Sequence, residues 1–233
     1  MAYLKPRYYN PGGRLLHSAS KVPRFSPIAA NLMFNMAVGD QSKPIAVYDP
    51  FVGNGVIFSI AQINFSDRIS SLFGIDTHTN AADAAIANMK MYSSAEILDT
   101  RIMEIQREHP DDNKFRNEAI ILSRHLSIKE PIPYDIRHGN ALTYRFPDAS
   151  GRKVIVTDPP YGISCLWQGK DGEETRVSQL EDFLQNILGQ GFTKVVLSSD
   201  NGQNLTHFLE KHFIMKDKRN IKRRILYEGD SKH

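Results

Sequence analysis

The chain has 233 residues, of which 41% are apolar, and its formal net charge is +3. This length suits one α/β domain with an insertion, and the apolar content is enough for a full core. The single cysteine, Cys165, excludes an internal disulfide and favours a reducing compartment. We expect a soluble, cytoplasmic protein without membrane contact, because no apolar run approaches the roughly 20 residues of a membrane span and the amino terminus lacks a signal-peptide pattern.

Basic residues cluster near both ends of the chain. The first acidic residue is Asp40, and every charged residue before it is a lysine or arginine. A second cluster occupies residues 216–224 and consists of Lys216, Lys218, Arg219, Lys222, Arg223 and Arg224. This distribution predicts contact with a polyanion. A basic surface that only faces solvent explains the pattern equally well.

Residues 1–25 are expected to form an N-terminal arm that precedes one domain over residues 26–233. The arm interleaves aromatic and basic side chains, as in Tyr8, Tyr9, Arg14, His17 and Phe25. Such a mixture suits stacking on bases and contact with phosphates. An arm wrapped over the domain with its aromatic rings buried is the alternative. A first helix is predicted over 27–38, capped by Ser26 and with a proline at its first position.

The next segment predicts a ligand site at the end of a first strand. Residues 45–48 are β-branched or apolar and lead into Asp49 to Gly55, after which a helix is predicted over 56–64. Gly53 and Gly55 allow a tight turn and close approach of backbone to a ligand. The pattern is neither a dinucleotide-binding fingerprint nor a P-loop. The glycine turn would present the amino end of the helix to that ligand.

A second strand over residues 72–76 ends at Asp76. A carboxylate at this position can accept hydrogen bonds from both hydroxyls of a ribose. Capping the next helix, predicted over 80–91, is the alternative role for Asp76. Periodic apolar residues then predict two helices over 94–108 and 114–127, which would form a helical hairpin inserted at about 92–130. A short strand starting near residue 134 exits through Gly139, Asn140 and Ala141.

Residues 154–157 read as a buried strand, and Asp158, Pro159, Pro160, Tyr161 and Gly162 follow it directly. Two consecutive prolines make a stiff bend, because proline has a fixed φ and no N–H. In an open α/β sheet this end of a strand is where ligands bind. The Asp158 carboxylate and the Pro159 carbonyl would accept hydrogen bonds from an exocyclic amine, and Tyr161 would stack on the ring.

The remaining residues complete the expected fold. A polar loop over 162–176 contains Trp167, which either closes over a target base or packs on the edge of the domain. A helix over 177–188, a strand over 193–199 and a helix over 205–212 are followed by a hairpin of residues 213–215 and 224–227, with the basic cluster at its turn. This alternation predicts a doubly wound, mostly parallel, seven-stranded α/β sheet.

Four segments carry a resemblance to one family of known enzymes: Asp49 to Gly55, Gly74 to Asp76, Gly139 to Ala141 and Asp158 to Gly162. Asp49 to Gly55 resembles motif I of the class I S-adenosylmethionine-dependent methyltransferases, and Asp158 to Gly162 resembles motif IV of those that methylate amino groups. A closer similarity is to the avilamycin-resistance 23S ribosomal RNA guanine methyltransferase family. It comes from Leu16 to Ala19 with Pro23 and Phe25, from the helical insertion and from the tryptophan beyond motif IV. The resemblance implies a Rossmann-like class I methyltransferase fold.

The chain departs from the patterns of these families at two positions. Asn140 stands where methyltransferases usually have an aspartate that contacts the adenine of the cofactor; its carbonyl oxygen can still accept a hydrogen bond. Pro159 stands where the avilamycin-resistance family has leucine, which restores the commoner form of motif IV.

The resemblance implies an S-adenosylmethionine-dependent RNA methyltransferase that modifies an exocyclic base amine, guanine N2 of 23S ribosomal RNA in the large subunit, with orthosomycin resistance as a phenotype. We expect a monomer that uses no metal. The implied catalytic residues are Asp158, Pro159, Pro160 and Tyr161. The implied cofactor-binding residues are Asp49, Phe51, Gly53, Gly55, Asp76, Asn140, Ala141 and Asp158. The residues expected to contact RNA are Arg14, His17, Lys222, Arg223 and Arg224.

Two other functions stay open. A DNA methyltransferase acting on adenine N6 or cytosine N4 uses the same motif IV, but it usually needs a separate target-recognition domain, for which this chain has little room beyond the helical hairpin. A non-enzymatic ribosome-binding module on a methyltransferase fold is the second alternative, and the presence of all the expected catalytic residue types argues against it.

Overall fold

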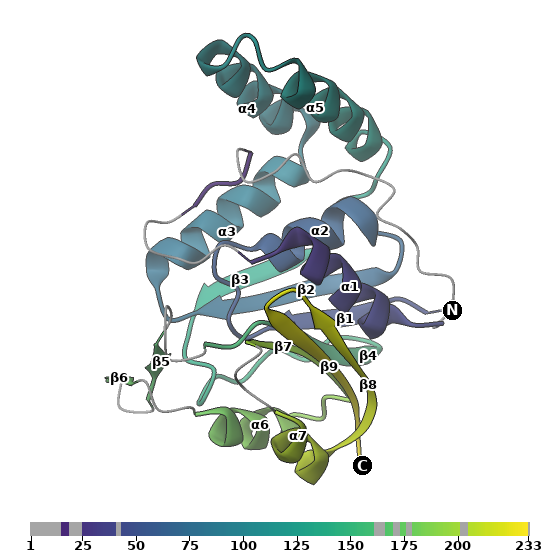
Figure 1. The fold of residues 1–233 in the computed structure, drawn as a ribbon, viewed down its shortest axis with the longest axis vertical. Helices are drawn as coiled ribbons and strands as arrows, with labels where there is room; N and C mark the ends of the chain where they lie inside the picture. Colours follow the sequence, from purple (N-terminus) through teal and green to yellow (C-terminus); the bar gives the residue numbers. More distant parts are fainter. Residues whose placement is uncertain are drawn as a thin grey trace.

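The structure, a computed structural model, describes residues 15–18, 25–40, 43–160, 166–169, 173–175, 179–200 and 205–232. Within these residues a seven-stranded sheet is flanked by helices (Figure 1). The strands of this sheet are β1 (Ile45–Asp49), β2 (Ile69–Asp76), β3 (Tyr134–His138), β4 (Arg152–Thr157), β7 (Lys194–Asp200), β8 (Phe213–Ile221) and β9 (Arg224–Ser231). The helices are α1 (Pro27–Val38), α2 (Val56–Asn64), α3 (Thr79–Tyr92), α4 (Ala95–Glu108), α5 (Asn113–Leu126), α6 (Leu180–Leu188) and α7 (Thr206–His212).

The strand order in the sheet is β3-β2-β1-β4-β7-β9-β8. The five strands from β3 to β7 pair in parallel, and β9 pairs antiparallel with both β7 and β8. Parallel pairing brings the carboxyl ends of β1, β2, β3 and β4 to one edge of the sheet. The expected doubly wound, mostly parallel seven-stranded fold is therefore confirmed.

Helices cover both faces of the sheet and bury two separate cores. Helices α1, α2 and α3 pack on one face, where Phe34, Phe58 and Met89 meet Val47 of β1 and Val154 of β4. Helices α6 and α7 cover the other face, where their apolar side chains meet the alternate strand residues Tyr48, Ile155 and Val195. Successive side chains of a strand point to opposite faces, so burial on both sides requires the near-continuous apolar runs seen in the sequence.

Helices α4 and α5 stand beyond α3, away from the sheet (Figure 1). Ser94 and Asp112 cap their amino ends by accepting hydrogen bonds from the backbone N–H groups of Ile97 and Phe115. A third core of apolar residues lies between these helices and the ends of α2 and α3, and the segment Leu15–Leu16 is buried in it. The predicted helices over 94–108 and 114–127 thus match α4 and α5 to within one residue.

The carboxyl-terminal hairpin is longer than the sequence analysis predicted. Strands were expected at 213–215 and 224–227 with the basic cluster at the turn, whereas β8 continues to Ile221 and β9 to Ser231. The turn is only Lys222 and Arg223, with Lys222 at a φ of 53°. The charged residues of β8 hid the strand, because they alternate between exposed and half-buried positions without an apolar face.

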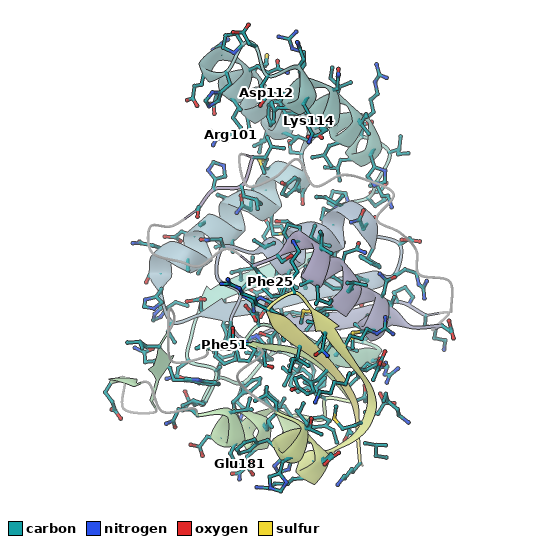
Figure 2. The ribbon with its side chains drawn as sticks, in the orientation of Figure 1. Phe25, Phe51, Arg101, Asp112, Lys114 and Glu181 are labelled. Carbon is teal, nitrogen blue, oxygen red and sulfur yellow. The ribbon has the colours of Figure 1, made fainter. Side chains whose placement is uncertain are left out.

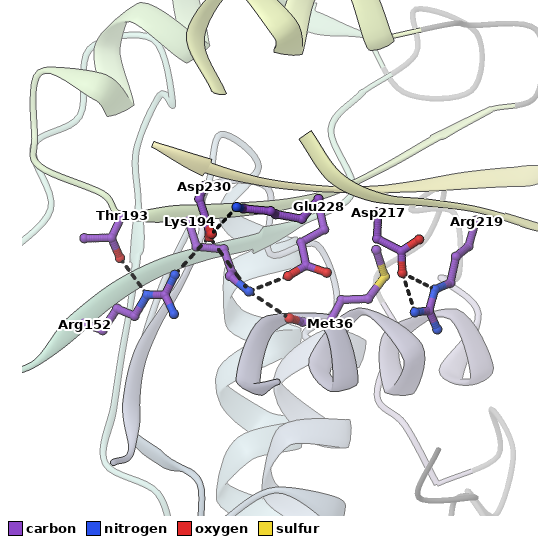
Figure 3. Close-up of polar contacts among 9 residues, drawn as sticks. Met36, Arg152, Thr193, Lys194, Asp217, Arg219, Glu228 and Asp230 are labelled. Atoms are coloured by element: carbon purple, nitrogen blue, oxygen red, sulfur yellow. Dashed lines mark hydrogen bonds and ion pairs between the residues drawn. The ribbon is translucent and has the colours of Figure 1, made fainter. Parts of the chain in front are cut away.

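Ion pairs fix this hairpin to its neighbours (Figure 3). The buried Lys194 of β7 pairs with Glu228 of β9 and also donates to the carbonyl oxygen of Met36 at the end of α1. Arg152 of β4 reaches Asp230 of β9 at 3.0 Å. These contacts join β9 to β4 and β7, and β7 to α1. They therefore help to hold the hairpin strand β9 in register with the parallel strands.

Two smaller predictions need correction. The segment 162–176 was expected to be a loop, but it contains a two-stranded sheet of β5 (Trp167–Gln168) and β6 (Glu174–Thr175). Helix α6 begins at Leu180 and not at residue 177; residues 176–178 lie outside the described part of the chain. No helix among the described residues is long and apolar enough to span a membrane.

Candidate functional site

The segment after β1 forms the predicted glycine turn. Gly53 and Gly55 have φ values of 51° and 71°, a backbone conformation that side chains with a Cβ rarely adopt. A Cβ on Gly55 would also lie 2.9 Å from the Cβ of Ala85 on α3. The turn therefore needs glycine for its backbone at both positions, and at Gly55 also for close packing of the turn on α3.

Asp76, at the end of β2, holds the turn in place. Its Oδ2 accepts a hydrogen bond from the N–H of Gly53 at 2.9 Å, and its Oδ1 accepts from the N–H of His78 at 2.9 Å. Helix α3 has His78 as its N-cap residue and no side-chain cap bond, so Asp76 contacts the residue at the helix start without capping the helix. A carboxylate has about four lone-pair sites, so these two bonds still leave Asp76 able to accept from ribose hydroxyls.

The exit of β3 lies against the same edge. The N–H of Gly139 donates to the carbonyl oxygen of Asp76 at 3.0 Å, and Ala141 is buried. The side-chain NH2 of Asn140 donates to the carbonyl oxygens of Gln168 and Gly169, and its Oδ1 accepts from the N–H of Leu142. An aspartate could not donate these bonds, which gives a physical reason for asparagine here: it ties the β3 exit to the β5 segment.

Phe51 and Trp167 form one aromatic group beside the turn. Phe51 meets Trp167 edge-on at 5.2 Å between ring centroids and Phe183 of α6 at 5.2 Å. Trp167 is only 2% exposed, which favours the packing role over the role of a lid for a target base. Its Nε1 is buried and has no hydrogen-bond partner within the described part of the chain.

Asp49 is a fully buried carboxylate at the centre of the site. Its Oδ1 accepts from Thr157 Oγ1 at 2.5 Å and from the N–H of Phe51 at 3.1 Å. Its Oδ2 is buried without a partner among the residues that the structure describes. Burial raises the pKa of Asp49 to about 7, the two hydrogen bonds oppose the rise, and the charges of Asp158 and Asp76 add to it.

Asp158, immediately after β4, is paired with a residue from the far hairpin. Its Oδ1 accepts from a guanidinium N–H of Arg224 at 2.5 Å, and both side chains are mostly shielded from solvent. Pro159 is buried and Pro160 is half-buried. Tyr161, the last predicted catalytic residue, lies outside the described residues. The structure thus brings Asp49, Asp76 and Asp158 together at the carboxyl ends of three strands.

Four of the five residues predicted to contact RNA are basic residues with different surroundings. Arg14 lies outside the described residues. Lys222 and Arg223 are exposed at the tip of the β8–β9 hairpin. Arg224, by contrast, points to Asp158 and donates to Ser198 Oγ at 3.1 Å.

His17 is fixed to α3 and to the glycine turn by a buried asparagine. The amide group of Asn88 accepts from the N–H of His17 at 2.7 Å and donates to the carbonyl oxygens of His17 and Asn54. Ser18 Oγ accepts from the side chain of Asn54 at 3.3 Å. Burial lowers the pKa of His17, with a further contribution from Arg101 and an opposing one from Glu104, which favours the neutral ring at pH 7.

Sequence reasoning missed Asn88, Thr157 and Ser198. Asn88 had a usable signal, because it continues the buried stripe of Ala81 and Ala85 on α3 at helical spacing. A polar residue on such a stripe needs buried partners. Thr157 is the last residue of the motif strand and could have been noted as a neighbour of the site. Ser198 had no local signal, since its role depends on a side chain 26 positions away.

The residues of this edge fit S-adenosylmethionine. Three carboxylates surround a turn whose backbone admits close approach, and a ligand that carries a sulfonium and an ammonium group would offset their mutual repulsion. The buried Oδ2 of Asp49 is an acceptor that such an ammonium group could satisfy. Asp76 is suited to the ribose. Within the described residues, no group of three or more His, Cys, Asp or Glu side chains could hold a metal ion.

Comparisons with solved structures show the same fold. Two structures of the rRNA methyltransferase AviRa from Streptomyces viridochromogenes match with TM-scores of 0.72 and 0.71; each is 17% identical and covers at least 98% of this chain and 96% of its own. A ribosomal-protein methylase from Lactobacillus delbrueckii subsp. bulgaricus matches with a TM-score of 0.53 at 16% identity, covering 93% of this chain and 84% of its own. A putative RNA methyltransferase from Pyrococcus horikoshii matches with a TM-score of 0.52 at 13% identity, covering 96% and 92%.

No curated protein matches the chain. The profile of the AviRa family, described as rRNA methyltransferase AviRa, matches residues 5–218. This match spans most of the chain and includes the glycine turn, Asp76 and the Asp158 segment. The fold and the family together imply the use of S-adenosylmethionine. The chain therefore belongs to the rRNA methyltransferase AviRa family.

Proposed function

We propose that this protein transfers a methyl group from S-adenosylmethionine to an exocyclic amine of a base in ribosomal RNA, and that the acceptor is guanine N2 of 23S ribosomal RNA. The observation that carries this proposal is the position of Asp158. It follows β4 directly and lies in the same cluster as Asp49 and Asp76, beside the glycine turn. A donor of a methyl group and an acceptor amine would therefore meet at one edge of the sheet.

Residues of β1, β2 and β3 would bind the cofactor. The turn of Gly53 and Gly55 would pass beneath the methionine part, and Asp49 would face its ammonium group. Asp76 would accept from the ribose hydroxyls. Phe51, Asn140 and Ala141 would line the adenine, with Asn140 acting mainly by holding the β3 exit to the β5 segment, because its side chain already bonds Gln168 and Gly169.

Asp158 and the Pro159 carbonyl would orient the target amine. When bound, S-adenosylmethionine supplies a methyl group activated by the positive charge on its sulfur. Hydrogen bonds from the amine to Asp158 and Pro159 turn the nitrogen lone pair towards this methyl group. The cofactor would supply this methyl group and keep the electrons of its former C–S bond, and Asp158 and Pro159 would hold the accepting nitrogen in line with it. The nitrogen then loses a proton to water, and stacking by Tyr161 keeps the ring in place meanwhile.

The arm and the hairpin tip would contact the RNA backbone. Lys222 and Arg223 are exposed at the turn of the hairpin, and Arg14 and His17 belong to the basic, aromatic arm. Because the lowered pKa of His17 favours a neutral ring at pH 7, its contribution would be stacking or hydrogen bonding. We propose that the enzyme acts as a monomer on ribosomal RNA or on the large ribosomal subunit and needs no metal.

Transfer of tritiated methyl groups tests this function. Wild-type protein is incubated with labelled S-adenosylmethionine and, in parallel, with 23S RNA, 16S RNA, large subunits, large-subunit proteins and duplex DNA. We expect label in 23S RNA or in the RNA of the large subunit. Label in the proteins or in DNA alone, or none in any substrate while the cofactor binds, would contradict the proposed function.

Resistance to orthosomycin antibiotics is proposed as the phenotype, on the strength of the resemblance to the avilamycin-resistance family. The test is the inhibitory concentration of avilamycin for a sensitive strain that expresses the wild-type protein or Asp158→Ala at equal levels. We expect resistance with the wild type only. Equal sensitivity of both strains, with the RNA methylated in the first, would remove this phenotype from the proposal.

A further inference from the structure

Arg224 is held on three sides at the site. Its guanidinium donates to Asp158 Oδ1 at 2.5 Å and to Ser198 Oγ at 3.1 Å, and it lies over the ring of Phe25 at 4.8 Å from the ring centroid. Phe25 immediately precedes the cap of α1 and lies by the tip of the β8–β9 hairpin (Figure 2). These three contacts come from the exit of β4, from β7 and from the end of the arm.

The strand order explains how Arg224 reaches Asp158. Strand β7 lies between β4 and β9 in the sheet, with Leu197 beside Thr157 and Asp200 beside Arg224. The guanidinium therefore crosses over the end of β7, where Ser198 supports it. The side chains of Arg224 and Asp158 retain 23% and 19% of their exposure, so the pair is shielded but not sealed from water.

We propose that Arg224 is a positioning residue that fixes the carboxylate of Asp158 for methyl transfer, an inference that rests on the proposed function. A carboxylate at the end of a strand can rotate about its own bond, and rotation would misalign the amine that it is meant to orient. The planar guanidinium engages Oδ1 in a fixed plane, which a lysine could not do. A carboxylate has about four lone-pair sites, so it can accept from Arg224 and from a target amine together.

Electrostatics gives Arg224 a second effect at the same place. Burial is the main cause of the raised pKa of Asp49, and the charges of Asp158 and Asp76 add to the rise, so Asp49 and Asp158 repel each other. The positive charge of Arg224 offsets part of this repulsion at Asp158. Release of Arg224 to an RNA phosphate would break its contacts with Asp158, Ser198 and Phe25 and restore the repulsion. The geometry thus assigns Arg224 to Asp158 and leaves the phosphate role to Lys222 and Arg223, which are exposed.

Steady-state kinetics on 23S RNA separates positioning from phosphate binding. The variants are Arg224→Ala, Arg224→Lys and Ser198→Ala, with Lys216→Ala as the matched control, because it removes one positive charge from the same hairpin at a residue paired with Asp230. We expect Arg224→Ala to lower kcat by about 10- to 100-fold, the usual effect of a misplaced catalytic group, with KM for RNA nearly unchanged. Ser198→Ala should lower kcat less, and Lys216→Ala should change neither parameter.

Chemical rescue adds a readout that a purely structural role would not move. Millimolar guanidinium chloride, compared with sodium chloride at equal ionic strength, should restore part of the kcat of Arg224→Ala, whereas Arg224→Lys should stay well below the wild type. A raised KM with unchanged kcat would make Arg224 a phosphate contact, and a raised kcat would make it a brake on Asp158; either result overturns the proposal. If Arg224→Ala does not fold, the kcat and KM of Ser198→Ala decide the question. Failure of the wild type to methylate any RNA would instead overturn the proposed function.

Discussion

Three aspartates from three strands meet around one glycine turn, and their surroundings give them different tasks. Asp76 binds backbone N–H groups, Asp158 binds Arg224, and Asp49 is buried with one oxygen that has no partner among the described residues. Burial raises the pKa of Asp49 to about 7. A buried carboxylate of this kind binds a cation most strongly when it is ionised.

The affinity for S-adenosylmethionine should therefore rise with pH between about 5.5 and 7.5. A cationic ligand favours the ionised form of Asp49, so binding lowers its pKa and releases protons to the buffer. Calorimetric titrations in two buffers of different ionisation enthalpy measure both effects. Asp49→Asn should bind more weakly but with a much flatter pH dependence. An affinity of the wild type that is constant across this range would contradict the role of Asp49.

The same raised pKa has a consequence for stability. Folded Asp49 holds its proton up to about pH 7, whereas an unfolded aspartate loses it near its usual value of 3.8. The folded state thus binds more protons between these values, so this group's contribution to stability is present below about pH 4 and is lost as pH rises towards 7. Denaturant unfolding of the wild type and of Asp49→Asn between pH 5 and 8 tests this. The free energy of unfolding of the wild type should fall relative to that of the variant as pH rises.

Asp76 gives a prediction for affinity at constant pH. Asp76→Ala removes acceptors for the ribose and for the N–H of Gly53, and each bond to a charged group contributes about 1.5–3 kcal/mol. We expect the Kd for S-adenosylmethionine to rise by about tenfold or more. Asp67→Ala is the control, because Asp67 is an exposed aspartate just before the amino end of β2. This variant should bind the cofactor normally. Equal affinities of wild type and Asp76→Ala would remove Asp76 from the cofactor site.

At the scale of elements, the hairpin of β8 and β9 divides its basic residues between two roles. Lys216 and Arg219 pair with Asp230 and Asp217 within the hairpin, and Arg224 pairs with Asp158. Lys222 and Arg223 form the exposed tip. The fold thus places part of this basic cluster along the strands and part at an exposed tip that can reach a polyanion.

The hairpin tip should determine the salt dependence of RNA binding. The double variant Lys222→Gln with Arg223→Gln should weaken binding and reduce the slope of log K against log salt by about one unit for each lost phosphate contact. Lys216→Gln with Arg219→Gln removes the same charge from paired positions and is the control. Filter binding to 23S RNA at several salt concentrations measures the slopes. Equal effects of the two double variants would mean that only the net charge of the hairpin matters.

Helices and strands marked by a capping residue or an apolar face could be predicted from the sequence. Elements without such a feature could not. The predicted cap of α1, Ser26, accepts from the backbone N–H of Ala29, and Ser94 and Asp112 cap α4 and α5 in the same way. Strand β8 lacks an apolar face and was read as a turn. The site residues Asp49, Asp76 and Asp158 could be predicted because each lies at the end of a strand or directly after it. The pairing of Asp158 with Arg224 joins residues 66 positions apart and leaves no trace in local sequence.

At the scale of the whole molecule, the sheet order is what assembles the site. Strands β2, β1 and β4 are adjacent, so their carboxyl ends place the cofactor residues beside Asp158. The antiparallel β9 then returns Arg224 to the same edge. Two residues of the arm also lie near the site. Phe25 contacts Arg224, and Asn88 links His17 to the glycine turn. Elements proposed to bind RNA and elements proposed to bind the cofactor therefore meet at Asp158.

Nucleoside mass spectrometry of 23S RNA, after reaction with S-adenosylmethionine carrying a deuterated methyl group, tests the central claim most directly. The wild type should place the label on guanine N2 at one site, and Asp158→Ala should reduce the yield by about 100-fold or more. Its affinity for the cofactor should change little, and thermal unfolding should show that it folds. Asp158→Asn, which keeps an acceptor oxygen, should be milder. Label on a ribose hydroxyl or a ring carbon, or full activity of folded Asp158→Ala, would contradict the account.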